Sequence, residues 1–402
     1  MIDGSQFGFV GMNMKRYRLG EICEIVSGST PKTSIQEYWD GDIKWITPAE
    51  ITDDSYIITD TVRKITKLGV EKNGLSSFPA GTVILSSRAP IGKVAIAGCD
   101  MYCNQGFKNL ICSKIINNKY LYWFLKGKKD YLNKLGRGAT FKEISKQIVA
   151  EIEIELPSLE EQVLVANNLL NIKRVIDLKK KEIDLFDKLI KARFVEMFGD
   201  LYLNTFKWDM KTIGELCTEI KSGLSRKLSN SDIGLPVIRS TNMINGELNT
   251  DDIKFWYVKD PQGACTDNYV LNDGDILVNF INSIAHIGKV CIFKDIGRPC
   301  IYTTNILRMQ LNESCNKYFF KYFTQTDCYT HQLKRIIQPA VNQASFTTVN
   351  YKKILIPLPP VELQKTFEDF VTQVDKSKVV YLKAARKYHK QSKVVEMKMS
   401  QC

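Results

Sequence analysis

The residues of this chain that could do chemistry do not have the spacing of a catalytic site. Gly92-Lys93 and Gly288-Lys289 are each followed by valine, and both lack the upstream glycine that a phosphate-binding loop requires. The only Pro-Pro pair, in "LPPV" (358–361), lacks the Asn or Asp and the aromatic residue of a DNA amino-methyltransferase. The three histidines lie far apart in the sequence. We therefore predict no catalytic residue and no metal ligand in this chain.

Composition narrows the class of protein further. The chain has 402 residues, of which 44% are apolar, and no apolar run reaches the length of a membrane-spanning helix. The closest of its 11 cysteines, Cys99 and Cys103, have no histidine beside them, which favours reduced thiols of a cytoplasmic protein over a zinc site. The net charge is +12, yet residues 158–200 carry as many acidic as basic side chains. The basic surplus on the globular parts favours a polyanionic partner.

The chain repeats itself, because motifs of its first half return in the same order in its second half. The motif pairs are "LGEICEIVSG" (19–28) with "IGELCTEIKSG" (213–223), "PAGTVILSSRAPIGKVAI" (79–96) with "NDGDILVNFINSIAHIGKVCI" (272–292), "YLYWFLK" (120–126) with "YFFKYFT" (318–324), "ATFKEIS" (139–145) with "ASFTTVN" (344–350), "ELPSLEEQ" (155–162) with "PLPPVELQ" (357–364), and "KARFVEM" (191–197) with "QSKVVEM" (391–397). This order indicates a tandem duplication of one domain plus one helix. Two similar sites at a fixed separation suit a target with two parts.

Each copy ends in a segment that is predicted to form one long helix. Residues 159–197 contain no glycine or proline; Pro157 precedes the segment and Gly199 follows it, as is typical of helix boundaries. Apolar residues recur there with a seven-residue period, which predicts an antiparallel coiled coil between the two helices. The residues expected to pair the helices are Leu169, Ile172, Ile176, Ile183, Phe186, Ile190 and Met197 in the first, and Phe367, Phe370, Val374, Tyr381, Tyr388 and Val395 in the second. The alternative is two independent amphipathic helices, each on its own domain.

The globular blocks have the pattern of mixed α/β domains. Short β-branched runs such as "TVILSS" and "DILVNF", bounded by Gly, Pro, Asp and Ser, predict strands. Residues 120–128 and 318–325 each predict an aromatic helix whose rings face a core. The fold class is therefore α/β (α+β), with two tandem domains that are each followed by a long helix. The expected boundaries are a leader at 1–16, a first domain at 17–156, a first helix at 157–199, a second domain at 200–356 and a second helix at 357–402.

The order of these motifs resembles the specificity subunit of type I restriction–modification systems, from about residue 17 to residue 397. The resemblance rests on "LGEI" and "SG" opening each block, on "SSRAPIGKVAI" followed by "NQGFK" (104–108), on "GATFKEIS", on "LPSLEEQ", and on the helix end "RFVEMFGD" (193–200). The second half departs from it, with "KVVEMKM" in place of that helix end and different loops, as different recognition of two half-sites would require.

The resemblance implies a function and a set of partners. Each block would be a target-recognition domain that reads half of a split sequence in double-stranded DNA, and the paired helices would set the spacing. Two modification (methyltransferase) subunits and up to two restriction/translocase subunits are the implied partners, and S-adenosylmethionine, ATP and Mg would be bound by them and not by this chain. Two rival functions stay open: the recognition subunit of a split DNA methyltransferase without a nuclease, and a coiled-coil adaptor that binds no DNA.

The residues that would contact DNA follow from chemistry. Forked donors and amides read base edges, whereas Lys, Arg and hydroxyl groups contact phosphates. In the first block the predicted DNA-binding residues, all in loops between apolar runs, are Arg88, Lys93, Lys108, Arg137, Thr140 and Lys142. In the second block they are Arg226, Arg239, Asn279, Asn282, His286, Lys289, Asn342 and Gln343. Arg88 and the pair Asn342-Gln343 are the preferred base readers. For each residue, the alternative is an ordinary solvated loop position.

Overall fold

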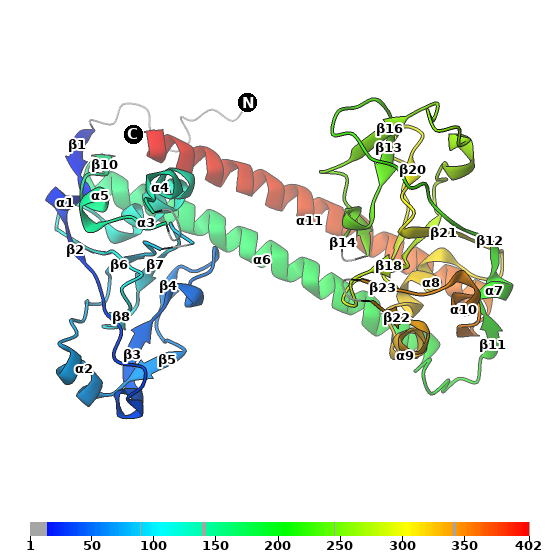
Figure 1. Cartoon of the computed structure of the whole chain (residues 1–402), viewed down its shortest axis with the longest axis horizontal. Coiled ribbons are helices and arrows are strands. Elements are labelled where there is room, and N and C mark those ends of the chain that lie inside the picture. Colours follow the sequence, from blue (N-terminus) through cyan, green and yellow to red (C-terminus); the bar gives the residue numbers. More distant parts are fainter. Residues whose placement is uncertain (1–13, 89, 139–141, 245, 341–342, 402) are drawn as a thin grey trace. The chain divides into compact units, whose positions relative to one another are not determined.

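The computed structural model describes residues 14–88, 90–138, 142–244, 246–340 and 343–401 of the chain (Figure 1). It divides into two compact units, Met1–Lys181 with Leu382–Cys402, and Glu182–Tyr381. The division crosses both long helices, so each unit contains one domain and a part of each long helix.

The first unit is built on three small sheets. Its strands are β1 (Lys15–Arg18), β2 (Cys23–Val26), β3 (Trp39–Ile46), β4 (Ile57–Ile58), β5 (Arg63–Ile65), β6 (Val83–Leu85), β7 (Val94–Ala97), β8 (Tyr102–Cys103), β9 (Asn109–Cys112) and β10 (Glu153–Leu156). Its α-helices are α1 (Leu19–Ile22), α2 (Lys67–Asn73), α3 (Asn118–Gly127), α4 (Lys129–Leu135), α5 (Lys146–Ala150), the beginning of α6 (Leu159–Phe198) and the end of α11 (Val361–Gln401). The strand orders are β2-β9-β6-β7-β4, β5-β3-β8 and β1-β10.

The second unit follows the same plan. Its strands are β11 (Asp209–Thr212), β12 (Cys217–Ser222), β13 (Gly234–Ile238), β14 (Met243–Ile244), β15 (Glu247–Leu248), β16 (Lys254–Tyr257), β17 (Ile276–Asn279), β18 (Ile281–Asn282), β19 (Val290–Ile292), β20 (Ile301–Tyr302), β21 (Ile306–Leu311), β22 (Gln338–Pro339), β23 (Ala344–Ser345) and β24 (Leu355–Leu358). Its α-helices are the end of α6, then α7 (Ile213–Leu216), α8 (Lys317–Phe323), α9 (Asp327–Ile336), α10 (Thr348–Tyr351) and the beginning of α11 (Val361–Gln401).

The sheet topology shows the duplication directly. The order β2-β9-β6-β7 returns as β12-β21-β17-β19, and β5-β3-β8 returns as β16-β13-β20. The antiparallel pair β1-β10 returns as β11-β24, so in each domain the first strand pairs with the strand that precedes the long helix. The predicted fold class, two tandem mixed α/β domains, is confirmed.

The glycines of two repeated motifs have the same structural role in both domains. The glycine that ends the opening motif, Gly28 or Gly223, lies so close to the next sheet that a Cβ would overlap the carbonyl oxygen of Cys103 or Tyr302. Only glycine fits such a close backbone approach. In the Gly-Lys pairs, Gly92 and Gly288 have φ angles of 85° and 75°, so they form the turn between β6 and β7, and between β17 and β19. These glycines therefore shape turns.

The glutamine of the motif before each long helix ties that helix to the domain. The Gln162 side chain accepts a hydrogen bond from the Asn117 backbone N–H at 2.8 Å and donates to the carbonyls of Ile115 and Pro157. Gln364 makes the same three contacts in the second domain, the first of them with the Asn316 N–H at 2.7 Å. Both glutamines are fully buried. The motif thus joins the start of the long helix to the start of the aromatic helix, α3 or α8.

The aromatic helices fill the domain cores, as predicted. Tyr120 through Leu125 of α3 are all buried against β6, β7 and β9 in the first unit. Phe319, Phe320 and Phe323 of α8 are equally buried in the second unit. These rings are unavailable for stacking on bases.

Two expected boundaries and one motif pairing differ from the structure. Strand β1 begins at Lys15, inside the expected leader, and β24 extends to Leu358, two residues beyond the expected end of the second domain. The pairing of 139–145 with 344–350 is wrong by three residues: Ser145 caps α5 as Thr347 caps α10, whereas the sequence pairing matches Ser145 with Asn350. The sequence pairing aligns Phe141 with Phe346, whereas the caps of the two short helices set the structural register.

The long helices α6 and α11 pack against each other within the second unit (Figure 1). The rings of Phe186 and Tyr381 are 5.4 Å apart, and those of Phe194 and Phe367 are 5.3 Å apart. Residue numbers rise along α6 while those of the contacting residues fall along α11, so the helices are antiparallel, as predicted.

The residues predicted to pair the helices have more than one role. Leu169 is buried in the core of the first domain with Val165 and Ala166. Ile190 is buried in a cluster that also contains Phe194, which the seven-residue period missed. Of the other predicted residues, Ile172, Phe367 and Val374 are buried, Ile176, Ile183, Phe186, Met197, Phe370, Tyr381 and Tyr388 are half-buried, and the side chain of Val395 lies outside the described residues. The helix ends therefore belong to the domain cores as well as to the helix pair.

Candidate nucleic-acid interface

The turn that follows β6 presents the first group of candidate residues. The Ser86 hydroxyl donates to the Pro90 carbonyl at 2.8 Å and accepts from the Lys93 backbone N–H at 2.9 Å. The Gly92 N–H donates to the Ser86 carbonyl at 3.0 Å. These bonds close the turn at its base, so the backbone of Arg88, between them, is held by neighbours on both sides.

Arg88 belongs to a charged cluster with Glu143 and Lys108. The Arg88 Nε donates to Glu143 Oε2 at 2.9 Å, and Lys108 Nζ donates to Glu143 Oε1 at 3.2 Å. Lys108 is buried and also lies 3.4 Å from the Ser87 hydroxyl, while the Arg88 side chain is 44% exposed. Partial burial favours the neutral form of Glu143, but the bonds and charges of Lys108 and Arg88 outweigh it and lower the pKa of this carboxyl. The carboxylate is therefore ionised at neutral pH and holds both cations.

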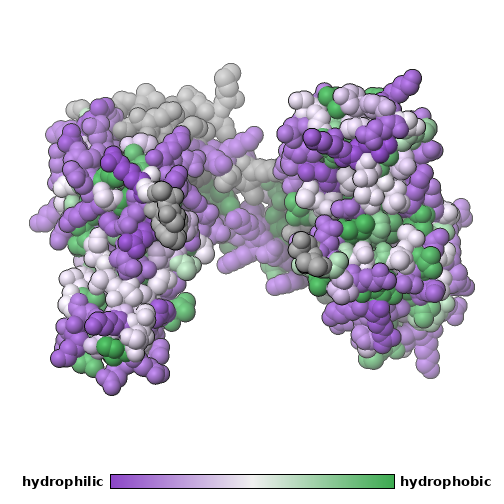
Figure 2. All heavy atoms as spheres, in the orientation of Figure 1, coloured by the Kyte–Doolittle hydropathy of each residue, from purple (hydrophilic) through white to green (hydrophobic). Residues whose placement is uncertain are grey.

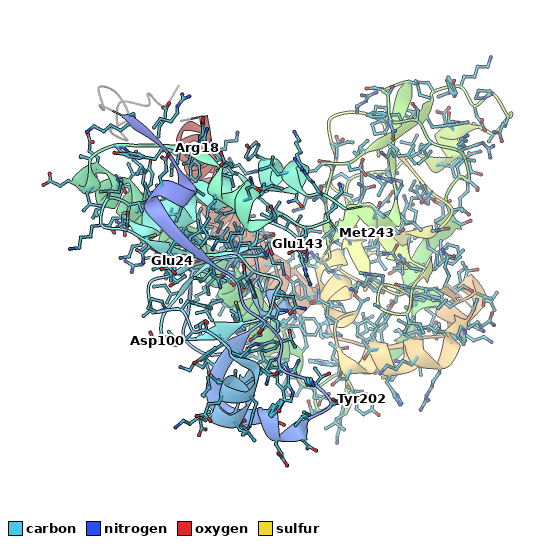
Figure 3. All side chains as sticks on the ribbon, turned by 60° about the vertical axis from the view of Figure 1, so that its left-hand side comes forward. Arg18, Glu24, Asp100, Glu143, Tyr202 and Met243 are labelled. Carbon is cyan, nitrogen blue, oxygen red and sulfur yellow. The ribbon has the colours of Figure 1, made fainter. Side chains whose placement is uncertain are left out.

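Glu143, labelled in Figure 3, lies in the segment between α4 and α5. Its backbone exchanges two hydrogen bonds with Arg137, at 2.9 and 3.0 Å, and bridges to Arg88. A cavity of about 760 Å³ opens beside this segment, with Lys108, Arg137 and Lys146 among its lining residues. The segment thus brings cations from several elements to one side of the first domain.

The other first-domain candidates are divided between the surface and the interior. Arg137 and Lys142 are exposed. Lys93 is half-buried, and its ammonium donates to the Pro48 carbonyl at 3.1 Å. Thr140 lies outside the described residues. Among the described first-domain candidates, Arg137 and Lys142 are therefore the cations that a phosphate could reach in the free chain without breaking a side-chain hydrogen bond.

In the second domain, two arginine candidates are held by aspartates. Arg226 donates three hydrogen bonds to the Asp260 carboxylate, the shortest of them 2.6 Å, and this lowers the pKa of Asp260 to about 2. Arg239 donates to the Asp252 carboxylate at 2.8 Å and to its backbone carbonyl. Both arginines are mostly buried, so in the free chain these ion pairs brace loops.

Four of the remaining second-domain candidates lie in or beside the segment between β17 and β19. His286 and Lys289 are exposed, with Lys289 Nζ 3.4 Å from His286 Nδ1. Asn282 is half-buried and accepts from the Ser283 N–H, whereas Asn279 is buried. Gln343 is exposed. Asn342 lies outside the described residues.

Sequence reasoning missed the acidic members of this site. Glu143, Asp260 and Asp252 hold arginine candidates from which they lie 55, 34 and 13 positions away along the chain. Glu143 stands within a repeated motif, and that position was the available signal. Its counterpart in the second domain is not acidic in either pairing, Thr348 by sequence and Ser345 by structure.

Metal-binding groups, disulfides and membrane-spanning helices are absent from the part of the chain that the structure describes. No group of three His, Cys, Asp or Glu residues that could hold a metal occurs among the described residues. The cysteines within the described ranges are all free thiols. None of the helices described is long and apolar enough to span a bilayer. The visible face of each unit is mainly hydrophilic, with smaller hydrophobic patches (Figure 2).

Comparisons with known proteins identify relatives that match both domains of the chain. A family model described as the type I restriction modification DNA specificity domain matches residues 12–185 and 206–387. The type I restriction enzyme MjaIX specificity subunit of Methanocaldococcus jannaschii is 34% identical over 252 residues, which cover 57% of this chain and 58% of that protein. The MjaVIII specificity subunit of the same organism is 24% identical over 381 residues, or 89% of this chain and 85% of the relative.

A solved structure shares the fold. The crystal structure of a type I restriction–modification S subunit from M. genitalium superposes with a TM-score of 0.58 at 15% identity, covering 97% of this chain and 96% of that one.

Proposed function

The chain belongs to the type I restriction–modification DNA specificity family, and on this premise we propose that it selects the DNA sequence on which its complex acts. Its two domains read the two parts of a split, asymmetric target in double-stranded DNA. The chain is not itself an enzyme; methylation and cleavage belong to partner subunits, which bind S-adenosylmethionine, ATP and Mg. The complex acts in the cytoplasm.

One observation carries this proposal: the same topology occurs twice, with different side chains at matching loop positions. The turn that carries Arg88 in the first domain carries Ile281 in the second, and the lysine of each Gly-Lys pair follows it in both. Two domains that share a fold but differ in their loops are suited to recognise two different half-sites in DNA. A basic chain with exposed arginine and lysine in these loops supplies the phosphate contacts that such reading needs.

The partners bind along the long helices. In the second unit, Leu185 and Leu189 of α6 are 60% and 48% exposed and lie one helical turn apart, on one face. Val379 and Val380 of α11 are also exposed. Apolar side chains on the outside of an already paired helix support the docking of a helix from a methylation subunit. Two methylation subunits and up to two restriction subunits complete the proposed complex.

The test is selection from randomised duplex DNA by the full chain assembled with its methylation subunit. The proposed function requires enrichment of a motif with two fixed parts and an unspecified spacer, with affinity that falls steeply as salt rises. Replacement of exposed Lys142 by Ala should weaken binding to all sequences alike and reduce the salt slope by about one. Enrichment of no motif, or binding that ignores salt, would favour the adaptor that binds no DNA.

A complex without a restriction subunit would use the same two domains. The two forms are separated by adding ATP and Mg to the complex purified from its source: cleavage of unmethylated DNA requires the restriction subunit, whereas methylation does not.

A further inference from the structure

The Arg88–Glu143–Lys108 cluster can be compared residue by residue with the second domain. The Ser86 N–H donates to the Lys93 carbonyl as the Asn279 N–H donates to the Lys289 carbonyl, each at 2.9 Å. Two residues further on, Arg88 bridges to Glu143 as Ile281 pairs with Ser345.

The third member of the cluster has its own counterpart. The Lys108 N–H donates to the Leu85 carbonyl of β6, and Leu307 pairs with Val278, the equivalent residue of β17. Arg88, Glu143 and Lys108 therefore correspond to Ile281, Ser345 and Leu307.

The charged cluster is not required by the fold. Leu307 is fully buried, and the second domain forms the corresponding strand pairing, on a longer turn, with one hydroxyl and two apolar side chains. Burying a lysine such as Lys108 costs free energy unless an acceptor compensates it, so an apolar residue would be the simpler choice for packing alone. In the first domain, by contrast, a lysine and a glutamate together fix the position of one arginine.

Glu143 does not occupy the terminal nitrogens of the Arg88 guanidinium, which are the donors that could contact a base. Glu143 accepts from Nε of Arg88, the nitrogen nearest the backbone. Within the described residues, no hydrogen bond occupies the two terminal nitrogens of this guanidinium, and the side chain is 44% exposed. Each oxygen of Glu143 has one cationic donor, Arg88 on one side and buried Lys108 on the other, so the carboxylate cannot swing without losing a bond.

We propose that Arg88 reads the major-groove edge of a guanine in the half-site of the first domain, and that Glu143, braced by Lys108, is its positioning residue. Guanine presents two acceptors, O6 and N7, which a guanidinium meets with two donors. A guanidinium whose orientation is already fixed before binding loses less conformational freedom when it binds a base. The second domain, with Ile281 and Ser345 at these positions, reads its own half-site by other chemistry. This inference rests on the proposed DNA-recognition function.

The experiment is selection from a pool of randomised duplexes by the full chain with its methylation subunit, followed by sequencing. Wild-type chain should enrich a guanine at one position that Arg88→Ala then loses, with a fall of roughly 5- to 150-fold in preference for that base. Glu143→Gln should lower the preference at the same position and leave the other half-site unchanged. In the double variant, Glu143→Gln should add nothing to the effect of Arg88→Ala, because the glutamate acts through the arginine.

Two further variants keep the test sharp. Glu143→Ser combined with Lys108→Leu installs the residues that the second domain has at these two positions, so the domain should fold, and this variant should show the same loss as Glu143→Gln. Glu151→Gln is the matched control, because it removes a carboxylate that pairs with Arg18 at 2.8 Å in the same region of the first domain. The control should retain the guanine preference.

The outcomes separate the two ideas. If wild-type chain enriches no split motif, the proposed function itself fails. If it enriches a split motif but the guanine preference survives Arg88→Ala and Glu143→Gln, only the assigned roles fail. If Glu143→Gln instead tightens binding to every duplex without changing base preference, Glu143 merely reduces the local positive charge, and its positioning role is wrong.

Discussion

At the scale of single residues, the acidic side chains decide which cations are available to DNA. Arg226 and Arg239 are engaged by aspartates inside the second domain, while Arg137, Lys142 and Lys289 are exposed. Arg88 is between these cases, because Glu143 holds it by one nitrogen and leaves it partly exposed. A count of basic residues therefore overstates the contact surface, and the pattern of carboxylates refines it.

The Arg226–Asp260 pair gives a prediction that depends on pH. Arg226 holds the pKa of Asp260 at about 2, below the usual value of about 3.9. The pair therefore contributes its full stabilisation at pH values above about 4, and this contribution is lost as the pH falls toward 2. Asp260→Asn should therefore lower the urea midpoint of the second domain at neutral pH. The difference from wild type should shrink as the pH falls below about 4. A difference that stays constant over this range would mean that the charge of Asp260 has no part in stability.

At the scale of elements, each long helix is attached to its domain by a buried glutamine and by apolar residues. Gln162 and Gln364 make the same bonds in the two copies, Leu169 anchors α6 in the core of the first domain, and Val371 anchors α11 in the core of the second. A helix fixed in this way moves with its domain. The attachment, and not only the helix pair, would transmit the orientation of a recognition domain to the rest of the subunit.

Removal of the Gln162 side chain tests this attachment. Gln162→Ala leaves the Asn117 N–H and the carbonyls of Ile115 and Pro157 without their partner, so we expect a loss of about 2–3 kcal/mol in the stability of the first domain, measured by urea unfolding. Gln147→Ala, at an exposed position, is the control and should change stability by less than about 0.5 kcal/mol. Equal stability of the two variants would contradict the proposed attachment.

Elements with a strong local pattern could be predicted from the sequence, whereas contacts between distant segments could not. Apolar runs and aromatic repeats were sufficient for β6, β17, α3 and α8, because burial dictates both their residues and their period. The short helices α5 and α10 carry little periodicity, and their caps, rather than the nearby phenylalanines, set the register. The contact of Arg88 with Glu143 joins residues 55 positions apart, and no local rule specifies it.

At the scale of the whole molecule, the chain has one scaffold twice and a helix from each copy that contacts the other within the second unit. The duplication supplies two recognition domains. In the proposed function, divergence of their loops supplies two specificities and the exposed face of the helices binds the partners. Each function can therefore be changed separately, by an exchange of loops, of a domain or of the helix face.

The helix face gives a prediction about assembly. Replacement of Leu185 and Leu189 by Glu should abolish co-purification with the methylation subunit, because charges would replace the apolar contact, while stability should change little since both residues are exposed. Val62→Glu, at an 86% exposed loop position of the first unit, is the control and should still assemble. Normal assembly of the double variant would place the docking surface elsewhere.

The most direct test of two separate readers is an exchange of one domain. Residues 19–152 are replaced by the same segment of a relative, which keeps β1 and β10 from one parent and so preserves their pairing. The chimera is assembled with the methylation subunit, and the methylated bases are mapped by single-molecule sequencing. One half of the recognised sequence should change to that of the relative, while the other half stays as in wild type. A map in which both halves change, or neither does, would contradict the account.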